Sequence, residues 1–317
     1  MKRQEPPTIT MTSATYVDKK LAKTLSAKYP DEIIPSDAPE IKGLSGIPEP
    51  PKCPYCGKKT PYIGTLTKGW IRWITSLQEA CSCPQAQAEI SKQEAEWAEQ
   101  ERQAQESRKQ KRIEALIEAS GLSARNRRQT FERWEPKEER MRQIKQLVEA
   151  YKDLAIRGEL EKNDGLNSLF MHGTCGAGKT HLACAVANAM IEAEKPVLLT
   201  TFGDLVQEIK STFIKGSKIS EKDIIEKYRR APMLIIDDLG KEKPTDWSAS
   251  ILFSILNHRY SDMKPTIITS NFAPEETINR IAPAEDDALC GRSIVSRIRE
   301  VYSILNISTD DHRAQRH

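Results

Sequence analysis

The sequence predicts an α/β domain with a parallel β-sheet between helices, preceded by a small cysteine-bearing module and a helical linker. Toward the C-terminus, short β-branched runs alternate with segments of helical periodicity, which is the pattern of parallel strands covered on both faces. Toward the N-terminus, two cysteine pairs precede a long run of helix-forming residues without glycine or proline. These observations divide the chain into residues 1–52, 53–84, 85–119 and 120–317.

The bulk composition excludes several classes of protein. The chain has 317 residues and a formal net charge of +3, which gives no strong overall field, so any basic binding surface must be local. No stretch approaches the ~18–20 apolar residues of a membrane span, and the N-terminus lacks the apolar run of an export signal. We therefore expect a cytoplasmic protein without membrane contact, in which clustered cysteines bind metal or remain free thiols.

Two regions are expected to contribute little to a folded core. Residues 1–52 predict a flexible leader, because prolines and glycines interrupt every regular element except a short helix around Tyr16 to Tyr29. Residues 85–119 predict a solvated connecting helix rather than a coiled coil, because their apolar residues are too sparse for a sustained heptad.

The region between them, residues 53–84, predicts a zinc-binding module. Its four cysteines, with no histidine between the pairs, are Cys53, Cys56, Cys81 and Cys83. This set predicts a four-thiolate Zn²⁺ site, with free thiols or a redox pair as alternatives because the second pair is C-x-C. Apolar residues between the pairs include Trp70, Ile71, Trp73 and Ile74. They predict a small core around the metal; beside Lys68 and Arg72, a partner surface or a base-stacking surface is the alternative.

Residues 120–317 predict the α/β domain. The apolar runs expected to form strands are "SLFMH", "PVLLTT", "APMLIIDD" and "PTIITSN". Helices are expected over about residues 180–194, 202–213 and 247–260.

A glycine-rich loop separates the first strand from the first of these helices. It fits G-x-x-x-x-G-K-[ST], in which glycines let backbone N–H groups turn inward around phosphate oxygens and the helix N-terminus adds positive charge. Lys179 is expected to reach the β- and γ-phosphates of ATP, and the Thr180 hydroxyl to bind Mg²⁺. The residues expected to contact the nucleotide are Gly173, Thr174, Cys175, Gly176, Ala177, Gly178, Lys179, Thr180 and His181.

Polar residues follow two of the other strands. Asp237 and Asp238 stand at the carboxyl end of "MLIIDD", where α/β folds place their ligands. Asp237 is expected to hold the water shell of the metal, and Asp238 to orient or deprotonate the attacking water. Asn271 ends the fourth strand, and its amide is expected to lie between the γ-phosphate and that water.

A basic segment with an aromatic residue follows the second strand. Its candidate contacts with single-stranded DNA are Lys210, Phe213, Lys215 and Lys218. Aromatic rings stack on bases and lysines bind phosphates, although a solvated amphipathic face is the alternative reading.

Taken together, these motifs resemble the AAA+ domain of DnaC-family helicase loaders and of the related IstB transposition ATPases. The resemblance covers roughly residues 120–305 and rests on "SGLSARNRRQTFERW", "GTCGAGKTHLACAVAN", "MLIIDDLGKEKPTDW", "ILNHRY", "PTIITSN" and "SIVSRIR". It implies a P-loop AAA+ fold with Lys179 and Thr180 in Walker A, Asp237 and Asp238 in Walker B, and Asn271 as sensor I.

The resemblance also implies assembly-dependent catalysis. It identifies Arg297 as the arginine that acts on the γ-phosphate of a neighbouring subunit, with Arg292 and Arg299 as alternatives, and so predicts a homo-oligomer on assembly. Asp238 stands where many AAA+ proteins have glutamate. Its shorter reach predicts an ATPase that is slow and stimulated by assembly or DNA.

The function implied by the resemblance is that of an ATP-dependent helicase loader. Such a protein binds single-stranded DNA and delivers a replicative, DnaB-like DNA helicase during the initiation of DNA replication, with residues 1–119 as the helicase-binding arm. The family places its single-strand contacts near Lys210 and Phe213. An IstB-like transposition helper and a non-hydrolysing, ATP-gated adaptor are the alternatives.

Overall fold

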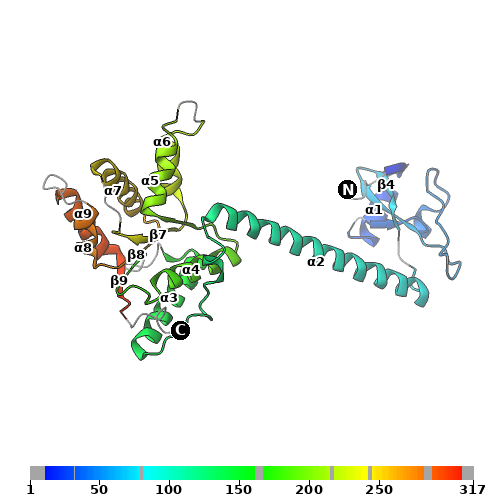
Figure 1. Ribbon diagram of the computed structural model, residues 1–317. Coiled ribbons are helices and arrows are strands. Elements are labelled where there is room, and N and C mark those ends of the chain that lie inside the picture. Colours follow the sequence, from blue (N-terminus) through cyan, green and yellow to red (C-terminus); the bar gives the residue numbers. More distant parts are fainter. Residues whose placement is uncertain are drawn as a thin grey trace. The chain divides into compact units, whose positions relative to one another are not determined.

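The computed structural model describes residues 11–31, 33–78, 81–160, 167–214, 218–241, 245–281 and 288–308 (Figure 1). The chain divides into two compact units, Met1–Gln105 and Glu106–His317. Each unit has a sheet and a hydrophobic core of its own, and the two are described separately. In the part of the chain described, no helix combines the length and the apolar character that crossing a membrane requires.

The first unit is built on an antiparallel sheet with strand order β1-β4-β3-β2. Its elements are β1 (Met11–Tyr16), α1 (Lys19–Lys28), β2 (Ile33–Pro35), β3 (Tyr62–Thr67) and β4 (Trp70–Gln78). Helix α1 begins after Asp18, whose carboxylate accepts the Leu21 N–H at 2.8 Å. The core includes Leu25 of α1 and Trp73 of β4, whose indole N–H donates to the Thr15 hydroxyl at 2.8 Å.

The expectation of a leader without stable structure does not describe residues 11–41. Strand β1 pairs with β4, β2 pairs with β3, and Ile34 and Ile41 lie in the same core as Trp73. The strands are short and find their partners far along the chain, so no local periodicity marks them. Gly64 permits the packing, because a Cβ there would come within 2.5 Å of Ile71 Cγ2.

A single helix, α2 (Pro84–Ser120), occupies the region where a solvated helix is expected, and the division between the units falls inside it. Residues 91–112 are all exposed. Ion pairs one turn apart, such as Glu99 with Arg102, support such a helix only weakly, by about 0.2–0.5 kcal/mol each.

The second unit contains a parallel sheet with strand order β6-β7-β8-β5-β9. Its strands are β5 (Ser168–His172), β6 (Leu198–Thr201), β7 (Leu234–Leu239), β8 (Thr266–Ser270) and β9 (Tyr302–Asn306). Its helices are α3 (Glu139–Arg157), α4 (Lys179–Glu192), α5 (Phe202–Ser211), α6 (Glu221–Arg230), α7 (Asp246–Ser261), α8 (Pro274–Ile281) and α9 (Ala288–Val301). This architecture confirms the predicted α/β fold with a parallel sheet between helices.

Alternating strand residues create one core on each face of this sheet. Leu169 and Ile235 pack with α3 and α4, whereas Phe170 and Ile236 pack with α5, α6 and α7 on the other face (Figure 1). Strand β9 was not among the expected strands; it pairs in parallel with β5 and completes the sheet beside the strand that leads into the glycine-rich loop.

A buried arginine joins three elements of the second core. The guanidinium of Arg259 donates to the carbonyl oxygens of Tyr228 and Ala231 at the end of α6, and to that of Pro265 before β8. Burial lowers the pKa of Arg259 to about 10. The side chain therefore satisfies backbone oxygens at a buried helix C-terminus.

Candidate nucleotide-binding and DNA-binding sites

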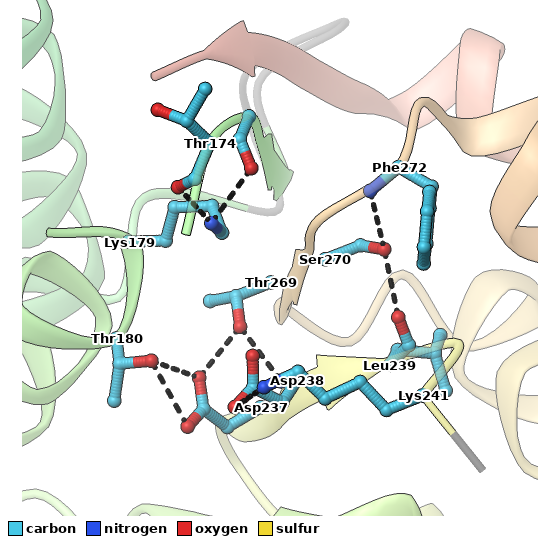
Figure 2. A network of polar contacts seen from close by, with 11 residues as sticks. Thr174, Lys179, Thr180, Asp237, Asp238, Leu239, Lys241, Thr269, Ser270 and Phe272 are labelled. Atoms are coloured by element: carbon cyan, nitrogen blue, oxygen red, sulfur yellow. Dashed lines mark hydrogen bonds and ion pairs between the residues drawn. The ribbon is translucent and has the colours of Figure 1, made fainter. Parts of the chain in front are cut away.

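The glycine-rich loop runs from the end of β5 into α4. Gly173, Gly176 and Gly178 all have positive φ, at 138°, 80° and 99°, which turns the backbone back on itself. The Lys179 ammonium donates to the carbonyl oxygens of Gly173 (2.9 Å) and Thr174 (2.8 Å). Figure 2 shows Lys179 beside Thr174. Burial lowers the pKa of Lys179. A cation held here, with the N-terminus of α4 behind it, fits the phosphates of a nucleotide.

The carboxylate of Asp237 lies opposite the loop, at the end of β7. It accepts the Thr180 hydroxyl at 2.8 Å and the Thr269 hydroxyl at 2.6 Å (Figure 2). Burial raises the pKa of Asp237, and the two hydroxyl groups oppose this by stabilising the charged form. Hydroxyl and carboxylate oxygens are ligands that Mg²⁺ prefers, so Thr180 and Asp237 fit the metal of a nucleotide.

Asp238 follows in an unusual backbone conformation. Its φ is +58°, in the left-handed region, and its carboxylate pairs with Lys241 at 2.7 Å. Asn271 directly follows Ser270, which pairs with Leu239 across the sheet, so both lie at the same sheet edge. The loop, the two aspartates and Asn271 therefore gather where the parallel strands end.

A segment that sequence reasoning noted only as an approach to the domain packs against the loop and α4. The His181 imidazole bonds to the Thr130 carbonyl oxygen at 2.8 Å, and the Asn188 amide donates to the carbonyl oxygens of Asn126 (3.0 Å) and Gln129 (2.8 Å). Trp134, at the end of this segment, is buried. The signal in the sequence was the aromatic pair in "TFERW", but nothing local ties it to the loop.

The candidate trans-acting arginines differ in their surroundings. Arg297 lies with its guanidinium 5.4 Å from the centre of the Tyr260 ring. Arg299 is held by Glu275, with its Nε 2.8 Å from a carboxylate oxygen. The side chain of Arg292 lies outside the described residues. Of the two described side chains, Arg299 is therefore engaged with a carboxylate, whereas Arg297 lies over an aromatic ring.

The proposed DNA-binding residues lie around the end of α5. Phe213 is 59% exposed, and its ring lies 5.7 Å from that of Trp247, which sequence reasoning missed. The Lys210 ammonium lies 5.9 Å from the centre of the same indole ring. Lys218 is exposed, and Lys215 lies outside the described residues. Trp247 lies at the start of α7, far from Phe213 in the sequence. No local sequence pattern therefore indicated that the two rings lie close together.

The four cysteines form a compact cluster. Their sulfur atoms lie within 4.8 Å of one another, with Cys53 and Cys83 at 3.8 Å and Cys56 and Cys81 at 3.4 Å. Zn–S bonds of about 2.3 Å in a tetrahedron separate sulfur atoms by about 3.8 Å, so the cluster fits such an ion. Backbone N–H groups of Cys56 and Tyr55 lower the pKa of Cys53 to about 7.

The small core that the sequence predicts around the metal does not form around the cysteines. Ile71 and Trp73 pack into the sheet core of the first unit, whereas the cysteines pack with Ala86 at the start of α2. Trp70 lies on the face of the sheet opposite Ile71 and Trp73, edge-to-face against Tyr16 with ring centres 5.1 Å apart.

Comparison with known proteins identifies relatives of this chain. The "Replicative helicase loader DnaI" of Bacillus subtilis (strain 168) is 32% identical over 109 residues, which cover 34% of each protein. The "Replicative helicase loader DnaC" of Escherichia coli (strain K12) is 29% identical over 144 residues, covering 45% of this chain and 55% of that one. The match thus spans less than two thirds of either relative. A crystal structure of DnaI shares 21% identity with a TM-score of 0.49, and covers 59% of this chain and 95% of that one.

The match to a protein family extends further along the chain. The family described as "IstB-like ATP binding protein" matches residues 74–317, which is more than half of the sequence. It includes the glycine-rich loop, the acidic strand end and Asn271. This chain is therefore a member of the IstB-like ATP-binding protein family, and it is similar to proteins named as replicative helicase loaders.

Proposed function

We propose that this protein is an ATP-dependent helicase loader that binds single-stranded DNA and delivers a replicative helicase during the initiation of DNA replication. The observation that carries the proposal is the hydrogen bond between Thr180 of the glycine-rich loop and Asp237, in a member of an ATP-binding family. The similarity to DnaC and DnaI supports helicase loading as the function that this ATP-binding site serves. Residues 120–317 are the ATPase domain in this proposal, and residues 85–119 its linker.

Residues of the protein perform four tasks in the proposed hydrolysis of ATP. Loop N–H groups and Lys179 bind the phosphates, while Thr180 and Asp237 hold Mg²⁺, which when bound neutralises charge on the transferred group. Asp238 and Asn271 orient the attacking water. Arg297 of a neighbouring copy stabilises the charge that develops on the γ-phosphate, so turnover depends on assembly.

The ion pair between Asp238 and Lys241 favours slow turnover. Asp238 has to leave Lys241 to reach a water molecule, and its side chain is one methylene shorter than glutamate. The pair is partly exposed and of modest strength, so it delays hydrolysis without preventing it. The same pair favours a second candidate, a non-hydrolysing adaptor whose ATP gates a protein contact. The match to the IstB-like family supports a third candidate, a transposition helper.

The first unit is the partner-binding arm in this proposal. Three large apolar side chains on the outer face of its sheet are unusually exposed: Tyr16 (60%), Ile33 (49%) and Trp70 (46%). They belong to three of its four strands and face away from the core that contains Ile71 and Trp73. Grouped aromatic and apolar side chains are the usual centre of a protein interface, and they fit a helicase partner. The cysteine cluster would hold a structural Zn²⁺ in the same unit.

A pull-down with a hexameric replicative helicase, in ATP and in ADP, tests the proposal together with an ATPase assay with and without single-stranded DNA. We expect capture that depends on the nucleotide and is lost in Lys179→Ala, while Lys195→Ala, an exposed lysine at the end of α4, behaves as wild type. Trp70→Ala should lose helicase capture and retain ATP binding. Helicase capture without turnover under any condition supports the adaptor, and no capture in either nucleotide excludes the loader.

A further inference from the structure

The pairing of β7 with β8 is interrupted at the two aspartates. Regular pairs run as far as Ile236 with Ile268, and the next pair is Leu239 with Ser270. Two residues of β7, Asp237 and Asp238, therefore stand against one residue of β8, Thr269, which is a β-bulge. Asp238 lies in this bulge with a φ of +58°, a conformation uncommon for a residue other than glycine. A bulge re-aims a side chain, and here the side chain is a carboxylate at the candidate nucleotide site.

One hydroxyl group takes the place of the regular strand partner. The Thr269 hydroxyl accepts the Asp238 N–H at 2.9 Å and donates to the Asp237 carboxylate at 2.6 Å (Figure 2). The side chain is fully buried in a strand whose other residues include Ile267 and Ile268. Burying a hydroxyl there is unfavourable unless it both donates and accepts a hydrogen bond. The Thr269 hydroxyl does both, and its partners are the two aspartates.

The next residue makes an equivalent link on the other face of β8. The Ser270 hydroxyl donates to the Leu239 carbonyl oxygen at 2.7 Å and accepts the Phe272 N–H at 3.1 Å. The Thr269 hydroxyl thus ties β8 to both aspartates, and the Ser270 hydroxyl ties Leu239 to the turn that carries Asn271. A displacement of β8 at this point moves both aspartates and Asn271 together.

We propose that Thr269 is a positioning residue for ATP hydrolysis, which holds Asp237 toward Thr180 for Mg²⁺ and fixes the direction of Asp238. The proposal rests on the ATPase function proposed above. The Thr269 hydroxyl bonds to the two aspartates. We therefore expect its loss to affect the metal and the chemical step, while the contacts of the phosphates with the loop persist.

Three variants test this role. Thr269→Val removes the hydroxyl at almost constant shape, Thr269→Ser keeps it, and Thr200→Val is the matched control. Thr200 is a buried threonine on β6 of the same sheet, and its hydroxyl donates to the Thr201 carbonyl oxygen at 3.0 Å. Each variant is assayed for binding of a fluorescent ATP analogue without metal. It is then assayed for the Mg²⁺ concentration that gives half of the maximal effect of the metal on binding of the analogue, and for kcat and KM of ATP hydrolysis with single-stranded DNA.

We expect Thr269→Val to bind the analogue without metal as wild type does. Its half-maximal Mg²⁺ concentration should rise, and its kcat should fall, by about 10–100-fold, the usual effect of removing a group that orients a metal ligand. Thr269→Ser should restore most of both, and Thr200→Val should change neither. Wild-type Mg²⁺ dependence in Thr269→Val, or equal losses in Thr269→Val and Thr200→Val, would overturn the proposal.

A wild-type protein that hydrolyses no ATP contradicts the proposed ATPase function and leaves the metal-binding readout decisive for Thr269. In that case a raised Mg²⁺ requirement in Thr269→Val, rescued by serine, supports the positioning role on its own. An unchanged requirement rejects it.

Discussion

The indole of Trp134 lies directly against Gly178 of the glycine-rich loop. A Cβ at position 178 would come within 2.3 Å of the Trp134 Nε1 atom, and Gly178 has a φ of +99°. Both the close approach and the backbone conformation therefore require glycine. If the loop backbone moves at Gly178 when phosphates bind, the environment of the Trp134 indole ring must change as well.

This contact makes Trp134 a reporter of the nucleotide. We expect ATP to change the intrinsic fluorescence of the protein, and Trp134→Phe to remove that change while a fluorescent ATP analogue still binds. Gly178→Ala should lose nucleotide binding. Gly158→Ala is the matched control, since Gly158 also has positive φ (69°) but nothing lies within 4 Å of its Cβ position; it should cost only about 1–2 kcal/mol of stability. Equal effects of the two glycine variants on nucleotide binding would contradict the packing argument.

Arg297 is expected to act on a neighbouring subunit. Arg297→Ala should bind ATP normally and lose hydrolysis by on the order of 10³-fold or more, because the guanidinium stabilises charge in the transition state only. Mixing it with Lys179→Ala subunits should restore part of the turnover, since some interfaces then combine an intact loop with an intact arginine. Arg299→Ala, which breaks the pair with Glu275, is the control and should keep most activity. Activity independent of protein concentration, with no rescue on mixing, would show that the arginine does not act in trans.

The cysteine cluster is expected to hold about one Zn²⁺ per chain. Cys53→Ser should lose the metal, whereas Cys175→Ser, a change in the glycine-rich loop, should retain it. Hydrogen exchange gives the sharper readout: without metal, the amides of Gly57 and Ala86, which bond to Cys53 O and Cys83 Sγ, should lose protection. The sheet should keep its protection because its core is separate from the cysteines. Metal-free protein with those amides still protected would refute the metal site.

The aromatic pair at the end of α5 is expected to stack on bases. Phe213→Ala and Trp247→Ala should each weaken binding of single-stranded DNA by about 1–3 kcal/mol, and Lys210→Ala should reduce the slope of log K against log salt by about 0.7. Trp97→Ala, an exposed tryptophan on α2, is the control for loss of an aromatic side chain. DNA binding insensitive to both aromatic variants would mean that Phe213 and Trp247 serve another surface.

The parts of the protein that could be predicted from sequence are those in which the signal is local. The loop from Gly173 to Thr180 and the run before Asp237 carry their spacing within a few residues, and strands β5, β6, β7 and β8 lie where their β-branched runs stand. The fold class followed from their alternation with helices.

The parts that could not be predicted depend on partners distant in the chain. Trp73 and Tyr16 sit on strands whose pairing spans more than fifty residues, so the alternation of buried and exposed side chains in β4 did not reveal which core they served. The contacts of Trp247 with Phe213 and of Thr269 with Asp238 form only when the sheet assembles, because the partners belong to other elements. A threonine in an apolar strand is ordinary until its acceptor and donor are known.

Strand β9 has a consequence for the order of events during synthesis. A Cβ at Gly173 would come within 2.1 Å of the carbonyl oxygen of Ile307, which follows β9, and the Ile307 N–H donates to the His172 carbonyl oxygen at 2.6 Å. The first glycine of the phosphate loop is thus in close contact with Ile307, a residue that is synthesised long after the loop itself. We therefore expect the phosphate loop to be complete only after β9 has paired with β5, so that tight binding of nucleotide follows the docking of this strand rather than preceding it.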